Sequence, residues 1–234
     1  MQKAGDFMKR SEIQEAVSWA RKILQENNLA LPMFADWTPE EWKARRAEAD
    51  TIIRTMRGWD VTTFGHNDFN RMGAVLFTIR NGLPDGSCGC PYAEKLILMK
   101  EGQVLPNHYH RQKTEDIINR GGGVLLIRVY NSLPDGSVDR KGTVRILTDG
   151  IEKFVPAGTD VEITRGNSMT IYPGLYHLFM PKAGCGDLIA GEVSSINDDR
   201  TDNFFEDTRS RFIPVDEDCM IRVLLCNEYD KILE

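Results

Sequence analysis

Residues 101–123 read EGQVLPNHYHRQKTEDIINRGGG. The spacing of His108, His110 and Glu115 in this stretch indicates the fold and the kind of site. His108 and His110 are two positions apart, so both imidazoles point to the same face of an extended strand. Glu115 follows the polar segment RQKT, which is long enough to turn the chain and return a carboxylate to the same place. Two imidazoles and one carboxylate suit a divalent ion such as Mn, Co, Fe, Ni or Zn.

A second stretch, residues 165–184, supplies a further histidine. It reads RGNSMTIYPGLYHLFMPKAG, in which an apolar strand meets a Pro-Gly turn and a returning strand begins at His177. The protein has only four histidines, and three of them lie in these two stretches. The fourth, His66, has no such support and is expected to be a surface or structural residue. The pattern predicts one metal site with the ligands His108, His110, Glu115 and His177.

The two stretches resemble the two sequence motifs of the cupin family. The first matches G-x5-H-x-H-x4-E-x6-G without a gap, from Gly102 to Gly122. The second resembles G-x5-7-P-x-G-x2-H-x3-N through Gly166, Pro173 and His177, although its Pro and Gly are adjacent and the final Asn is missing. The resemblance implies a mainly β fold, a cupin barrel of the double-stranded β-helix or jelly-roll type, with the three histidines and the glutamate binding a metal inside it.

The sequence around these motifs agrees with a β-rich fold. After residue 60 it consists of short runs rich in Val, Ile, Leu, Thr and Tyr, which alternate with turn signals such as NGLPDGS and NSLPDGS. This spacing is typical of an antiparallel sandwich or barrel. In both turn signals Pro presets φ and Asp-Gly reverses the chain, so both are expected to be tight turns. The predicted strands are 75–80, 95–100, 123–130, 143–147, 161–164, 168–172 and 187–193.

Residues 1–60 are predicted to be helical. Ser11 and Gln14 have the spacing of a capping box, and apolar residues then recur on one helix face up to Asn27. A second helix is expected from Thr38, with Pro39 in its first turn, to residue 57, where Gly58 would cap it. We expect one cupin domain over residues 1–234, with the helices of 1–60 packed outside a barrel and C-terminal strands formed by 61–234.

Composition excludes several classes of function. Hydrophobic residues make up 41% and charged residues 27% of the 234 residues, as in an ordinary globular protein. The net charge of −6 and the absence of a basic cluster argue against a nucleic-acid partner. No apolar tract is long enough for a membrane span or a signal peptide, which predicts a cytoplasmic location without a membrane partner. The five cysteines are expected to be free thiols, and exposed barrel edges make a homodimer the expected assembly.

An open metal site next to a sugar could support isomerisation, which also needs acid and base groups to move protons. Lys95 lies just before the first motif, where partial burial beside a cation would lower its pKa, and Lys100 is its rival. Glu192 follows small and apolar residues in a predicted strand, where a carboxylate is costly unless it has a function. Glu206 lies in a polar and aromatic segment that could cover the barrel mouth. Spacing alone does not choose among them.

Three longer stretches narrow the resemblance. YAEKLILMKEGQVLPNHYHRQKTEDIINRGGG, GEVSSINDDRTDNFFED and the helix SEIQEAVSWARKIL are similar to the D-lyxose ketol-isomerase family of cupins over nearly the whole chain. The resemblance implies an aldose-ketose isomerase that interconverts D-lyxose and D-xylulose, and often D-mannose and D-fructose, with Mn(II) commonly the best metal. It also implies a lysine upstream of the His-x-His pair and a C-terminal glutamate in proton transfer or positioning. Lys95 matches the lysine by its position. Glu206 is the first choice for the glutamate, and Glu192 follows closely.

Three other functions share parts of this pattern. A cupin dioxygenase could use the same ligands but would consume oxygen. A phosphosugar isomerase would need a cationic cluster, for which Arg209 and Arg211 are adequate by charge. A sugar-sensing or storage cupin without catalysis is the least favoured, because the N-terminal helices show neither the basic character nor the arrangement of a DNA-binding module.

Overall fold

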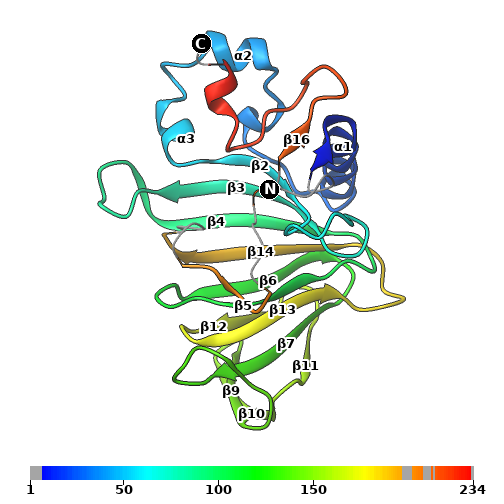
Figure 1. Cartoon of the computed structure of the whole chain (residues 1–234), viewed down its shortest axis with the longest axis vertical. Helices are drawn as coiled ribbons and strands as arrows, with labels where there is room; N and C mark the ends of the chain where they lie inside the picture. The colour runs from blue at the N-terminus through cyan, green and yellow to red at the C-terminus, as the bar shows by residue number, and fades with distance from the viewer. Residues whose placement is uncertain (1–6, 197–201, 208–211, 213, 233–234) are drawn as a thin grey trace, which may run out of the picture.

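Most of the β-strands form two curled sheets that face each other, as the computed structural model in Figure 1 shows. The structure describes residues 7–196, 202–207, 212 and 214–232. One sheet has the strand order β10-β9-β12-β6-β14-β4-β3-β2 and the other β11-β7-β13-β5-β15, with β8 paired to β7. This architecture confirms the predicted mainly β, cupin-type fold. The strands are β2 (Gly58–Thr62), β3 (Ala74–Gly82), β4 (Gly89–Met99), β5 (Leu105–Tyr109), β6 (Glu115–Gly122), β7 (Leu125–Ser132), β8 (Val138–Asp139), β9 (Thr143–Thr148), β10 (Ile151–Pro156), β11 (Asp160–Ile163), β12 (Ser168–Ile171), β13 (Leu175–Pro181), β14 (Leu188–Ser195) and β15 (Phe204–Phe205).

Strand β4 shows how the sequence separates the inside of the barrel from the outside. Ile97 and Met99 belong to the core between the two sheets, whereas Leu96 and Leu98 belong to a second core on the outer face. A strand that is buried on both faces reads as a continuous apolar run instead of an alternating one. Lys95 has the same alternation as Ile97 and Met99, so the strand carries its lysine into the barrel.

Helix α1 (Arg10–Glu26) covers the outer face of β2 and β3 and buries the apolar face predicted from its sequence, including Ile13 and Val17. Its first turn differs from the prediction. The helix begins at Arg10, and Glu12 accepts a hydrogen bond from the backbone N–H of Lys9. Ser11 and Gln14 instead bind the C-terminal segment at Asp218 and Arg222, so tertiary contacts replace the expected capping box.

The second predicted helix is two short ones, α2 (Pro39–Ala44) and α3 (Asp50–Arg54), separated by turns at 45–49 and preceded by the 3₁₀ helix η1 (Met33–Asp36). The capping box between Thr38 and Glu41 is present as predicted. The chain reverses at Met56, with φ of 51°, and Gly58 starts β2 rather than capping a helix. A Cβ atom at Gly58 would lie 2.5 Å from the hydroxyl of Tyr229, which explains the glycine.

The C-terminal residues leave the barrel and pack against the helices (Figure 1). β16 (Val215–Asp216) pairs in parallel with β1 (Met8–Lys9), and the 3₁₀ helix η2 (Tyr229–Ile232) lies against α2. Trp42 and Tyr229 form the aromatic centre of this contact, with ring centroids 4.6 Å apart. The N-terminal helical part and residues 214–232 therefore stabilise each other beside the barrel. None of the described helices is both long and apolar enough to cross a membrane.

The two LPDGS sequences form the tight turns that were predicted. Asp85 accepts hydrogen bonds from the backbone and hydroxyl of Ser87, and Asp135 accepts the same two bonds from Ser137. The glycine of each turn has a positive φ, 71° at Gly86. The repeated sequence therefore reflects a repeated turn and not a repeated domain.

Arg10 fixes the junction of the two chain ends. Its guanidinium is fully buried and binds the carboxylates of Glu217, at 2.8 Å, and Glu228, at 2.5 to 2.9 Å. The hydrogen bond from Arg10 lowers the pKa of Glu217 to about 2. Burial alone would raise the pKa of Glu228, but hydrogen bonds from Arg10 and Lys231 lower it.

We predict that Arg10→Ala lowers the free energy of unfolding by about 3 kcal/mol at pH 7, because it removes the buried guanidinium from the carboxylate of Glu228 and leaves Lys231 and the backbone N–H of Leu225 as its donors. Both carboxyl pKa values are depressed in the folded state. The stabilisation is therefore complete above the unfolded pKa and is lost as pH falls from about 5 to about 2. Urea unfolding at several pH values measures it. Arg128→Ala, which breaks an exposed pair with Asp160, is the control and should cost less than about 1 kcal/mol. Equal losses for the two variants would contradict the role of Arg10.

Candidate metal centre and acid-base site

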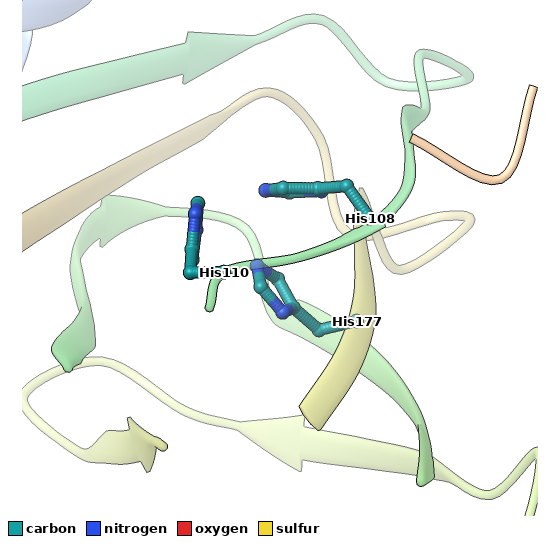
Figure 2. A group of neighbouring side chains, drawn as sticks. All are labelled: His108, His110 and His177. Carbon is teal, nitrogen blue, oxygen red and sulfur yellow. The ribbon is translucent and has the colours of Figure 1, made fainter. Parts of the chain in front are cut away.

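Two adjacent strands bring three histidines to one point in the barrel. His108 on β5 lies directly opposite His177 on β13, and His110 follows the end of β5. Figure 2 shows the three imidazoles turned toward one another. One ring nitrogen from each lies within 4.8 Å of the other two, and all three residues are buried. The expectation that alternation places His108 and His110 on one face is confirmed.

The hydrogen bonds of the three rings determine which nitrogen can bind a ligand. In each ring Nδ1 contacts a backbone carbonyl, of Pro106 for His108, Asp202 for His110 and Leu175 for His177, at 2.9 to 3.0 Å. A carbonyl only accepts, so Nδ1 must carry the proton and Nε2 of a neutral ring has a free lone pair. The Nε2 atoms of His110 and His177 are buried without a hydrogen-bond partner among the described residues. Such an arrangement fits a metal ion.

Glu115, the first residue of β6, faces two of these lone pairs. Its Oε1 lies 3.2 Å from Nε2 of His177, and its Oε2 lies 3.4 Å from Nε2 of His110. Carboxylate oxygens and unprotonated Nε2 atoms are all acceptors, so they repel one another unless a cation lies between them. The donor set therefore fits a divalent ion of borderline character, with three nitrogens and one carboxylate.

The pKa shifts keep this donor set in its metal-binding form. Burial lowers the pKa of His177, and burial together with the neighbouring imidazoles of His177 and His110 lowers the pKa of His108 well below its usual value. Burial alone would raise the pKa of Glu115, but the charge of Lys113 and the contact with His110 hold it well below its usual range. At neutral pH the two rings are neutral and the carboxylate is ionised.

The proton-transfer candidates Lys95 and Glu192 lie beside the histidines. They are direct cross-strand partners on β4 and β14, with Nζ of Lys95 at 3.6 Å from Oε1 of Glu192. Both are almost completely buried, 2% and 5% exposed. Lys113 and Lys95 lower the pKa of Glu192 to about 2, against the effect of burial. Glu192 is therefore ionised at neutral pH.

Lys113 lies between Glu115 of the metal-ligand group and Glu192 of the proton-transfer pair. It was not identified from the sequence. Its Nζ lies 2.6 Å from Oε2 of Glu115 and 2.9 Å from Oε1 of Glu192. Burial alone would lower its pKa, but these two carboxylates raise it. The signal that could have found it is its place two residues before Glu115, on the same face of an extended chain. The result is an alternating series of buried charges, Glu115, Lys113, Glu192 and Lys95.

A small cavity joins these residues. It has a volume of about 40 Å³, which is room for about three water molecules. Its charged and polar lining includes His108, His110, Lys95, Lys113 and Glu192, and its apolar lining includes Phe64 and Phe205. The ring of Phe205 stacks on His108 with centroids 5.2 Å apart. Potential metal ligands and potential proton carriers therefore line the same cavity.

Comparison with known proteins identifies the family. The sequence profile of the D-lyxose isomerase family matches residues 8–229. The chain belongs to the D-lyxose isomerase family. A D-lyxose/D-mannose isomerase of Escherichia coli O157:H7 is 39% identical over 227 residues, covering 95% of this chain and 98% of the relative. One from Serratia proteamaculans is 39% identical over 225 residues with the same coverage. The chain is thus an enzyme of the sugar isomerase class.

The fold is also shared outside this family. The L-ribose isomerase of Cellulomonas parahominis superposes with a TM-score of 0.60 at 13% identity, covering 91% of this chain and 100% of that one. The L-ribose isomerase of Acinetobacter sp. DL28 gives a TM-score of 0.60 at 15% identity with the same coverage. At this identity the likeness shows a common fold and nothing finer.

Two other candidates for proton transfer, Glu206 and Lys100, are not among the residues that line the cavity, and neither is His66, which was expected to be a surface or structural residue. Glu206 is exposed and its carboxylate binds Asn107 and Arg140. Lys100 lies over the rings of Trp19 and Phe69 on the outer side of β4. His66, 20% exposed, is 3.7 Å from Asp207. Arg209 and Arg211 lie outside the described residues.

We predict that Mn(II) raises the unfolding temperature of the metal-stripped protein. An ion that binds only the folded state at 100 times its Kd adds about 2.7 kcal/mol of stability. His177→Ala should abolish the shift, and His66→Ala, the same substitution at the histidine outside the cluster, should retain it. Differential scanning calorimetry measures both. An equal shift in the two variants would place the ion elsewhere.

Proposed function

We propose that this protein is a metal-dependent aldose-ketose isomerase that interconverts D-lyxose and D-xylulose, and also D-mannose and D-fructose. The observation that carries the proposal is the pairing of Lys95 and Glu192 across β4 and β14, next to the cluster of histidines and Glu115. Two relatives with 39% identity over 95% of the chain are named D-lyxose/D-mannose isomerases, which supports the choice of substrates.

The proposed ligands of the metal are His108, His110, Glu115 and His177, and the proposed ion is Mn(II), with Co, Fe, Ni and Zn as alternatives. The uncompensated lone pairs described above support this assignment. Such an ion supplies Lewis acidity that polarises a sugar carbonyl. The protein holds the ligand atoms in place through the three Nδ1–H bonds, so little rearrangement is needed on binding.

The reaction itself moves two protons. Conversion of an aldose into a ketose removes hydrogen from C2 and adds hydrogen to C1, while a proton leaves O2 and another reaches O1. In our proposal the ionised Glu192 takes the proton from C2 and delivers it to C1. Lys95, which faces Glu192 across the strands, exchanges a proton with the sugar oxygens.

The position of Glu192 favours it over Glu206 as the carboxylate of the reaction. Lys113, Lys95 and the hydroxyl of Ser194 all contact Oε1 of Glu192, at 2.9, 3.6 and 3.1 Å. These contacts hold the carboxylate at Oε1, and we propose that Oε2 exchanges the proton. Glu206 faces Asn107 and Arg140 instead. Its catalytic role stays a prediction without support from its position.

A free monosaccharide fits the cavity better than a phosphorylated one. Among the described residues, the cations that line the cavity are Lys95 and Lys113, and both face carboxylates. A phosphate would have to displace these carboxylates.

Three expectations from the sequence stay predictions. They are the cytoplasmic location, the homodimer and the treatment of residues 1–234 as one cupin domain with a helical extension. Size-exclusion chromatography with light scattering tests the assembly directly, with a mass of twice 26.5 kDa expected for the dimer.

We predict that the protein with Mn(II) converts D-lyxose into D-xylulose, and that chelation stops the reaction until Mn(II) is returned. In deuterated water the ketose should carry deuterium at C1, because Glu192 exchanges its proton with solvent between the two transfers. Mass spectrometry of the product measures this. Turnover by the metal-free protein would contradict the metal role, and product without deuterium would favour hydride transfer. Consumption of oxygen would indicate a dioxygenase.

We predict that Glu192→Gln lowers kcat for D-lyxose by about 10²- to 10⁴-fold, since an amide cannot accept the proton from C2. Glu206→Gln is the matched control, an identical substitution at the carboxylate outside the cavity, and should change kcat by less than about threefold. Steady-state kinetics at saturating Mn(II) compares the two. The reverse order of effects would assign the reaction to Glu206.

A further inference from the structure

A short segment from the C-terminal part of the chain lies against the proposed metal site. Within residues 202–207, strand β15 pairs with β5, so that Phe204 lies opposite Tyr109 and Phe205 opposite His108. Figure 1 shows this strand in orange beside β5. The aromatic rings reinforce the pairing, since Phe204 stacks on Tyr109 with centroids 5.1 Å apart. The segment therefore extends the sheet that carries two of the histidines.

The first described residue of this segment, Asp202, binds the turn between His110 and Glu115. Its Oδ1 accepts hydrogen bonds from the backbone N–H groups of Arg111 and Gln112, at 2.8 and 3.0 Å. Its Oδ2 accepts from the N–H of Lys113 at 2.9 Å. Three successive N–H groups that converge on one carboxylate fix both the turn and the residue that binds it.

The backbone of the same residue orients His110. The carbonyl of Asp202 accepts the Nδ1–H of His110 at 3.0 Å. The other two histidines receive this support from their own strands, where Pro106 and Leu175 each lie two residues before the histidine. Among the three rings, His110 alone depends on a segment that is distant in sequence. Its orientation therefore depends on how firmly Asp202 is held.

We propose that Asp202 is a positioning residue for the metal site. Its carboxylate binds the 111–113 turn, which keeps its carbonyl against Nδ1 of His110 and so directs Nε2 into the cavity. The same bonds place Lys113 between Glu115 and Glu192. This inference rests on the proposed function, because it assumes that His110 and Glu115 bind the ion.

The test is Mn(II) binding to the full chain, followed by the electron paramagnetic resonance signal of free Mn(II). Loss of a group that orients a metal ligand typically raises Kd by about 10- to 100-fold, and this increase is expected for Asp202→Ala. Asp202→Asn keeps one oxygen that can accept from Arg111 and Gln112, so its increase should be smaller. Asp207→Asn is the control, because Asp207 lies in the same segment but faces His66. Its Kd should equal that of the wild type.

Hydrogen exchange of the metal-free protein gives a second readout. The amides of residues 111–113 should exchange faster in Asp202→Ala, while the amides of β6 and β14 keep the wild-type rates. If Asp202→Ala does not fold, Asp202→Asn carries the same comparison. Wild-type Kd and wild-type exchange in the Asp202 variants would overturn the inference. A wild-type protein that binds no Mn(II) would instead overturn the metal function on which the inference rests.

Discussion

The repulsion among buried acceptor atoms is the constraint on which the site depends. Three imidazoles donate their Nδ1–H groups to carbonyls, and two of them direct Nε2 at the carboxylate of Glu115. In the interior of a protein such contacts between acceptors are costly, because the low dielectric strengthens their repulsion, and Lys113 reaches only the carboxylate. A cation among these atoms turns the repulsion into coordination. The surrounding strands hold the side chains in this geometry.

The barrel supplies that support through strand register. Pairing of β5 with β13 places His108 opposite His177, and pairing of β4 with β14 places Lys95 opposite Glu192. A shift of one residue in either pair would turn these side chains to the outer face. In the β4–β14 pair the apolar residues on both faces of β3 and β4 resist such a shift, because α1 covers the outside while the barrel core fills the inside. The helical extension therefore contributes to the site without touching it.

Much of the fold and the metal centre could be predicted from the sequence, because both follow from local spacing. The His-x-His pair needs only the alternation of a strand, and the burial of Glu192 followed from its place among small and apolar residues. The turns at Asp85 and Asp135 likewise depend on neighbouring residues alone.

Sequence spacing does not specify contacts between residues that are far apart in the chain. The start of α1 and the break between α2 and α3 follow from packing with the C-terminal segment. The contacts of Asp202 join residues about 90 positions apart, and our proposal of Glu192 in preference to Glu206 rests on the strand register.

The central claim is that one divalent ion is bound among the three histidines and Glu115. Its most direct test is an anomalous difference map, recorded at the manganese absorption edge from crystals grown with Mn(II). The account predicts a single strong peak within coordination distance of Nε2 of His108, His110 and His177 and of a carboxylate oxygen of Glu115. A fully occupied Mn(II) peak elsewhere, or a map without a peak at this position under saturating Mn(II), would contradict it.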